Sequence, residues 1–164
     1  MKMPAIRAQP GFTLVELMVV IAVLAILASI GIPGFQGVVA ENRATSAANE
    51  LLATLQFARS AAIAQSRPVI VRPTAGGNWG GGWVVEMMNE DEKLERLRES
   101  PALGSVNLTG EAPLIFSSTG TLPGHANYPV LFDLQVTSGP KASRTICMTL
   151  GGSSKVIRGG GEEC

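Results

Sequence analysis

Residues 12–35 read FTLVELMVVIAVLAILASIGIPGF, and this stretch decides the fold of the chain. A helix needs about 20 mostly apolar residues to cross the hydrocarbon core of a bilayer. A cleavable secretory signal carries an apolar region of only about 7–15 residues, followed by a site of small residues. Because the run here is longer, and its small residue Gly11 comes before it, the sequence predicts a membrane anchor.

The charges on either side of this run predict its orientation. Lys2 and Arg7 precede it, and no charged residue lies between Glu16 and Glu41. Basic residues tend to stay on the cytoplasmic side of a membrane. We therefore expect the N-terminal end to remain in the cytoplasm and the C-terminal part to be exported.

Glu16 is the exception in the apolar run. A carboxylate costs roughly 2.5–3.5 kcal/mol at the centre of a bilayer and less near the interface. One interpretation is a side chain that extends to the lipid headgroups. The other is a charge that is satisfied by a cation from a neighbouring subunit, and the residues around Glu16 favour it.

The junction Gly11-Phe12-Thr13-Leu14-Val15-Glu16, followed by Leu17-Met18-Val19-Val20-Ile21, resembles the leader junction of type IV prepilins and of type II secretion pseudopilins. The resemblance implies that a prepilin peptidase cuts between Gly11 and Phe12 and N-methylates Phe12. It also implies that Glu16 pairs with the N-terminal amine of an adjacent subunit and that Pro33 matches a family proline. Two such charges neutralise one another only across a correctly staggered subunit contact. The expected parts are a leader (1–11), a transmembrane and filament-core helix (12–35) and a pilin head (36–164).

The helix pattern continues into the head. Pro33 removes a helix hydrogen bond, and with glycines around it this stretch can kink or melt when it is packed in a filament. We expect the helix to resume after Gly37 and to end near Gln65. Apolar residues then recur on one arc of about 100° at helical pitch, which predicts an amphipathic helix lying on a sheet. The arc contains Ala44, Ala47, Ala48, Leu51, Leu55, Ala58 and Ala62.

The remainder of the chain reads as short strands separated by glycine and proline. The expected strands are 69–71, 83–87, a weaker one through Leu94 and Leu97, 114–116, 130–136, 145–150 and 155–158, with a turn at 151–154 joining the last two. The charged run at 90–99 is typical of a solvated edge strand or loop rather than a calcium site. A long helix followed by an antiparallel sheet predicts an α+β fold.

The head resembles the minor-pilin and pseudopilin family known as GspH/FimT. The residues that carry the resemblance are the helix end at 55–62, Gly82-Trp83-Val84-Val85, and Ile115-Phe116 followed by Gly120. Many members end in a Gly-Arg-x-Arg hairpin tip that is sometimes associated with DNA binding. Here Lys155 stands at the position of the first arginine, and Arg158 comes one position later than the second. In a strand this shift places Arg158 on the opposite face from the one that the motif would give it. We therefore do not favour DNA contact.

Few other residues suggest chemistry. Cys147 and Cys164 lie too far apart, with too few further ligands, for a metal site, so we favour a disulfide in an oxidising compartment over two unrelated thiols. His125 has no serine, cysteine or carboxylate at a telling spacing, and we expect it to be an exposed loop residue. The 13 basic and 13 acidic residues cancel, so no net charge points to nucleic acid.

The sequence therefore predicts a non-enzymatic filament protein without cofactor or metal. The leading hypothesis is a minor pilin that joins or primes a type IV pilus. The alternatives are a minor pseudopilin of a type II secretion system and a DNA-binding subunit of a pilus. The expected partners are other pilins or pseudopilins, the prepilin peptidase and the inner membrane, with the head in the periplasm.

Overall fold

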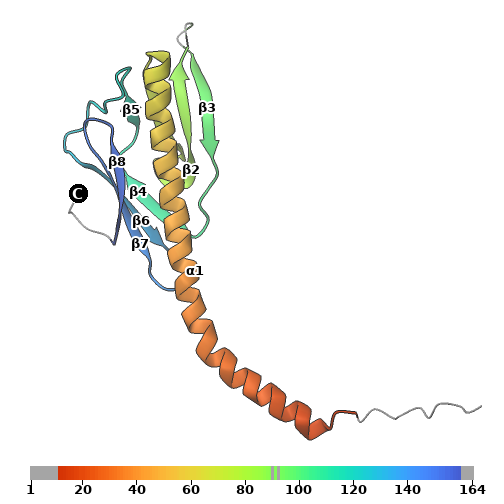
Figure 1. Cartoon of the computed structure of the whole chain (residues 1–164). Helices are drawn as coiled ribbons and strands as arrows, with labels where there is room; N and C mark the ends of the chain where they lie inside the picture. The colour runs from red at the N-terminus through yellow and green to blue at the C-terminus, as the bar shows by residue number, and fades with distance from the viewer. Residues whose placement is uncertain (1–10, 90, 92, 160–164) are drawn as a thin grey trace, which may run out of the picture. The chain divides into compact units, whose positions relative to one another are not determined.

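The computed structural model describes residues 11–89, 91 and 93–159, and it divides into two compact units that meet between Phe35 and Gln36. A single helix, α1 (Leu14–Gln65), runs through both units (Figure 1). Its end at Gln65 confirms the prediction, and the helix is continuous through Pro33 rather than resuming after Gly37 as expected. One proline removes a single backbone hydrogen bond, and the bonds on either side can keep the helix continuous. The kink or melting near Pro33 on packing in a filament stays a prediction.

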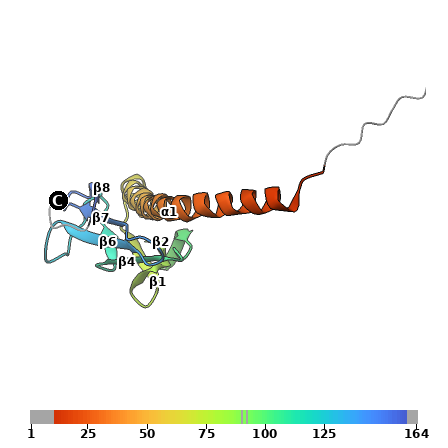
Figure 2. The ribbon, with the colours of Figure 1, turned by 90° about the horizontal axis from the view of Figure 1, so that it is seen from below.

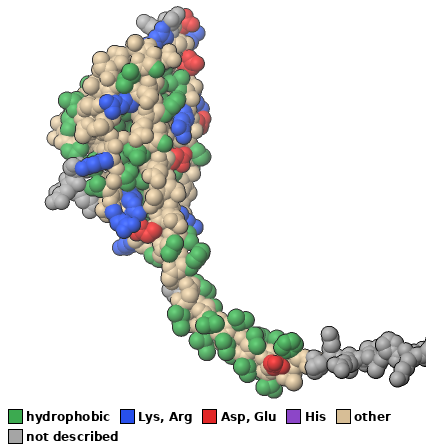
Figure 3. Space-filling model, viewed as in Figure 1, with side chains coloured by type: hydrophobic (Ala, Val, Ile, Leu, Met, Phe, Trp, Pro, Cys, Tyr) green, Lys and Arg blue, Asp and Glu red, His purple; other side chains and the backbone are tan. Residues whose placement is uncertain are grey.

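The first unit exposes its apolar side chains. Within the described residues, α1 is the one helix that is long and apolar enough to cross a membrane. Its large apolar residues from Phe12 to Phe35 are between 46% (Val20) and 83% (Phe12) exposed, and Figure 3 shows them on the visible side of the helix. No part of the described chain covers this surface.

In the second unit, α1 buries the predicted arc. Every residue of that arc is at most 5% exposed, and Ala40 extends it by one turn. Alanines leave room for strands to approach the helix closely, while Leu51 and Leu55 fill the space between. Inside this contact the Trp83 Nε1 donates to Thr54 Oγ1 at 3.1 Å, so the buried indole has a polar partner.

The strands form two antiparallel four-stranded sheets rather than the single sheet expected, and both lie on the same side of α1 (Figure 2). The first sheet has the order β3-β2-β1-β5 and the second β4-β6-β7-β8. The strands are β1 (Val69–Ala75), β2 (Asn78–Met88), β3 (Leu94–Ser100), β4 (Val106–Gly110), β5 (Leu114–Phe116), β6 (Val130–Val136), β7 (Ser143–Met148) and β8 (Ser154–Arg158).

Local chemistry explains most of these strands. Gly76 and Gly77, with φ of 49° and 89°, form the two-residue turn between β1 and β2, which requires positive φ at both positions. β3 is a charged and largely exposed edge strand, as predicted. β4 is the one strand that the sequence did not predict, because only Val106 and Leu108 alternate inward before Gly110.

Candidate assembly segment and basic head surface

The first turn of α1 is capped by Thr13. The backbone N–H of Glu16 donates to Thr13 Oγ1 at 3.2 Å, and the N–H of Leu17 donates to the Thr13 carbonyl at 3.2 Å. Thr13-x-x-Glu16 therefore has the spacing of a capping box, in which the glutamate also favours the positive end of the helix. The sequence analysis missed Thr13, although a Thr-x-x-Glu signature before an apolar run would have identified it.

Glu16 stands on an otherwise apolar, exposed helix surface. Its neighbours Leu14, Val15 and Leu17 are 74%, 68% and 56% exposed. Among the residues that the structure describes, no cation lies within ion-pair distance of Glu16. The cap fixes where the helix starts and leaves the carboxylate to be satisfied by lipid headgroups or by another chain.

A second polar group lies where α1 enters the head. Arg144 on β7 donates through Nη2 to Glu41 Oε2 at 2.6 Å and to Thr45 Oγ1 at 3.0 Å, and through Nη1 to the Ser143 carbonyl at 2.8 Å. The hydrogen bond from Arg144 is the largest effect and holds the pKa of Glu41 below its ordinary value, although desolvation opposes it. The charges of Arg144 and Arg158 lower the pKa of Glu41 by smaller amounts. This group ties the helix to the second sheet.

Two further cations lie at the same end of the head. Arg43 Nη1 donates to Ser138 Oγ at 3.1 Å, in the turn between β6 and β7, and Lys141 is exposed in that turn. Figure 3 shows basic side chains gathered around this part of α1. The pattern of charges along the sequence did not reveal this cluster, because its members lie about 100 residues apart.

The two basic residues proposed for DNA contact lie on opposite faces of β8. Arg158 is paired with Arg144, whereas Lys155 is paired with Cys147, and partners in an antiparallel ladder share a face. Positions 144 and 147 are three residues apart, so the two pairs face opposite sides. Arg158 therefore joins the cluster around Glu41, and Lys155 does not.

Comparison with known protein families supports the interpretation of both the N-terminal segment and the head. Residues 47–152 match the profile of the Type II transport protein GspH, and residues 6–32 match the prokaryotic N-terminal methylation motif. The chain belongs to the GspH family. It is also 30% identical over 144 residues to the type IV major alpha-pilin of Moraxella bovis, a match that covers 88% of this chain and 77% of that protein.

Other relatives of this GspH-family chain share one part of it or the fold. It is 41% identical over 68 residues to a fimbrial protein of Pseudomonas aeruginosa, and it spans only 44% of that protein's length. The type IV minor pilin FimU of Pseudomonas aeruginosa has a TM-score of 0.60 at 23% identity, covering 71% of this chain and 89% of that chain. The minor pseudopilin EpsH of Vibrio cholerae has a TM-score of 0.57 at 14% identity, covering 71% and 97%. The chain therefore has the α+β fold of pilins, as predicted.

Several predicted residues of the GspH-family chain are not tested by these findings. Gly11 and Phe12 precede the helix and Pro33 lies within it, while leader residues 1–10 lie outside the described part. Cys147 is buried on β7, but its predicted partner Cys164 also lies outside the described residues. The disulfide stays a prediction.

His125 lies in a loop, as expected, but the expectation that its side chain is exposed to solvent is wrong. Its side chain is 9% exposed, and Nδ1 lies 2.5 Å from Glu111 Oε2. Glu111 follows β4, and His125 lies in the loop before β6. The two loops meet beside a cleft of about 470 Å³, lined also by Pro113 and Pro123. His125 and Glu111 are 14 residues apart in the sequence, and the fold brings them together. No local sequence motif predicts this contact.

Proposed function

We propose that this chain is a minor type IV pilin, made as a prepilin and incorporated into a pilus or used to start one. The observation that carries the proposal is the exposed apolar first half of α1 with one carboxylate, Glu16, at its capped start, on a chain that matches the methylation motif. Such a helix needs lipid or other helices around it. Membership of a pilin family supports assembly with other pilins or pseudopilins.

The processing steps follow from the same segment. Prepilin peptidase would cut between Gly11 and Phe12 and methylate the new amine of Phe12. That amine would then pair with Glu16 of an adjacent subunit, so that each charge is neutralised only at the correct stagger. The cap by Thr13 supports this role because it holds Glu16 in the first helical turn, close to the new terminus.

The proposed location is the inner membrane, with one crossing by residues 12–35 and the head in the periplasm before assembly. The basic residues Lys2 and Arg7 support a cytoplasmic leader. An interaction role for the head is supported by the pilin relatives, and two of its ionisable pairs hold the fold together. These pairs are Glu41 with Arg144 and Glu111 with His125.

Two other functions have a specific observation in their favour. A minor pseudopilin of a type II secretion system is favoured by the GspH match and by the fold shared with EpsH. A DNA-binding subunit is favoured only by the basic residues of the second sheet, and the separation of Lys155 from Arg158 weighs against it. Recovery of the chain in pili sheared from the cell surface would favour the pilus over the pseudopilus.

The test is substitution of Glu16 in the host bacterium. Glu16→Val should leave the chain in the membrane but remove most of it from sheared filaments, because a neighbour's amine is left unpaired in an apolar setting. Thr13→Ala is the matched control: it weakens the helix cap by about 1 kcal/mol and keeps the carboxylate, so incorporation should persist. Equal incorporation of Glu16→Val and wild type would refute the pairing role.

A further inference from the structure

Among the described residues, the end of the head where α1 enters it carries more basic than acidic side chains, and none of them belongs to the proposed assembly segment at 12–35. Two carboxylates of α1, Glu41 and Glu50, lie in this region. The cations that gather there come from four elements: Arg43 from α1, Lys141 from the turn between β6 and β7, Arg144 from β7 and Arg158 from β8.

In the part of the chain that the structure describes, Arg144 is the one cation of these four that forms an ion pair with a carboxylate. The Arg144 side chain is 8% exposed and bonds to Glu41 at 2.6 Å. Arg43 donates to the neutral hydroxyl of Ser138. Within the described residues, no ion pair joins Arg43, Lys141 or Arg158 to a carboxylate, and the Lys141 and Arg158 side chains are exposed. Three cations at one end of the head are therefore available to an external anion.

The position of the cluster along the chain indicates which anion. The apolar run ends at Phe35, and Arg43 comes eight residues later in the sequence, a span of at most about 29 Å even for a fully extended chain. The polar layer of a bilayer adds roughly 5–8 Å on each side of the hydrocarbon core, and charges act over about 8 Å beyond it at physiological salt. Because the chain tethers the cluster this close to the membrane segment, the headgroups around residues 12–35 are at a high effective concentration near it.

We propose that Arg43, Lys141 and Arg158 bind the phosphate groups of anionic phospholipids on the membrane face from which the head emerges. The inference rests on the proposed membrane insertion of residues 12–35. The contact holds the head at the membrane before assembly and is broken when the subunit is extracted into a filament. Duplex DNA offers the same phosphates, but membrane headgroups surround the anchor of this chain, whereas DNA must diffuse to it.

The test compares the full chain in nanodiscs of phosphatidylcholine alone and of phosphatidylcholine with 30% phosphatidylglycerol. Hydrogen exchange is measured at Ser138, Gly139 and Lys141, in the exposed turn between β6 and β7. At 50 mM salt we expect exchange about fivefold slower in the anionic discs, the gain that one basic residue makes near an anionic surface. The difference should disappear at 0.5 M salt because charges are screened.

Variants assign the effect to the cluster. The combined substitution Arg43→Gln, Lys141→Gln and Arg158→Gln should abolish the difference between the discs, and Lys141→Gln alone, in an exposed turn, should reduce it without risk to folding. Lys155→Gln is the matched control, since it removes a cation from the same strand as Arg158 but from the opposite face. It should leave the difference intact.

The outcomes separate this inference from the proposed function. A chain that enters both discs but exchanges equally in them overturns the lipid contact and leaves the membrane anchor standing. A chain that enters neither disc overturns both. Slowing by duplex DNA in phosphatidylcholine discs, greater than the slowing by phosphatidylglycerol, would assign the cluster to nucleic acid and overturn the inference.

Discussion

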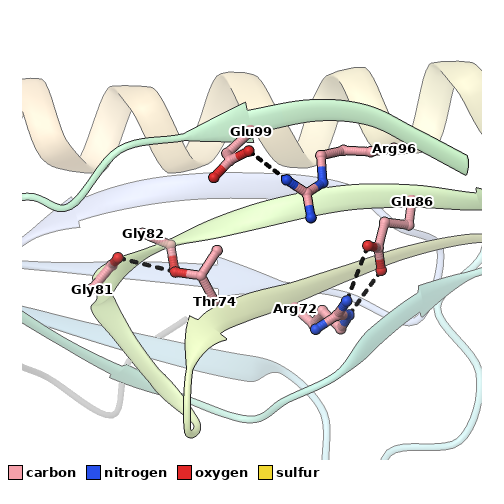
Figure 4. Close-up of polar contacts among 7 residues, drawn as sticks. All are labelled: Arg72, Thr74, Gly81, Gly82, Glu86, Arg96 and Glu99. Atoms are coloured by element: carbon pink, nitrogen blue, oxygen red, sulfur yellow. Dashed lines mark hydrogen bonds and ion pairs between the residues drawn. The ribbon is translucent and has the colours of Figure 1, made fainter.

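Arg72→Ala should destabilise the head more than Arg96→Ala, although each removes one arginine from the same face of the first sheet (Figure 4). Arg72 makes a bidentate pair with Glu86, with Nε–Oε2 at 2.8 Å and Nη2–Oε1 at 3.0 Å. The Glu86 side chain is only 6% exposed, while that of Arg72 is 44% exposed. Arg96 and Glu99, 2.7 Å apart, are both more than half exposed.

Burial sets the expected magnitudes. Removing one partner of a fully buried ion pair costs about 3–5 kcal/mol, because the other charge is left unpaired. Exposed pairs contribute about 0.2–1 kcal/mol. Because only the Glu86 end of its pair is buried, we expect Arg72→Ala to lower the free energy of unfolding by about 1.5–3 kcal/mol. For Arg96→Ala we expect less than about 1 kcal/mol.

The assay is denaturant unfolding of the full chain in detergent, followed by fluorescence of Trp79 and Trp83, which are both fully buried. The hydrogen bonds that Arg72 donates to Glu86 raise the pKa of Arg72 above its already high value. A raised pKa adds stability below the unfolded-state pKa and loses it only at extreme alkaline pH, so the cost should be the same from pH 6 to 9.

Replacing both partners, Arg72→Leu with Glu86→Leu, should recover most of the loss, since no buried charge remains. A cost for Arg96→Ala equal to or larger than that for Arg72→Ala would refute the reasoning from burial.

Three further predictions concern processing, oxidation and pH. Mass spectrometry of the chain from its host should show cleavage after Gly11 with N-methylation of the new terminus; an intact Met1 terminus in the presence of the peptidase would contradict this. Cys147 and Cys164 should form a disulfide that stabilises the head by about 3 kcal/mol, and two free thiols in a non-reducing peptide map of periplasmic material would exclude it. Because the pKa of Glu41 is lowered, its contribution should be present above the unfolded-state value and lost as pH falls through the folded-state value; wild type should therefore lose stability relative to Glu41→Gln on acidification from pH 6 to 3, and parallel pH profiles would disprove it.

The parts of the fold that local sequence determines were predictable. The apolar run at 12–35 and the alanine arc ending at Ala62 each follow one periodicity over many residues, and both appear in α1 as expected. β5 and β6 have the predicted bounds because β-branched and aromatic residues are enclosed by turn residues. The motif at Gly11 identified the family from a few residues.

The parts that depend on distant residues were not predictable. Glu41 and Arg144 are 103 positions apart, and only the packing of α1 against β7 brings them together. His125 meets Glu111 because two loops converge. The division into two sheets follows from pairing partners, and β4, with few apolar residues, takes its place by pairing with β6.

Under the proposed function, the choice between lipid and filament depends mainly on Glu16. Lipid chains are as apolar as the side chains of the helix, so moving residues 12–35 from a bilayer into a bundle of similar helices changes apolar burial little. Close packing contributes, but it acts on any helix of this composition. The charge of Glu16 differs, because an unpaired carboxylate near the apolar layer is unfavourable and a paired one in a filament is not. Glu16 is the one charged residue in the stretch 12–35, where the other polar side chains are the small hydroxyls of Thr13 and Ser29. We therefore expect this single carboxylate to be enough to favour the correct stagger over every other.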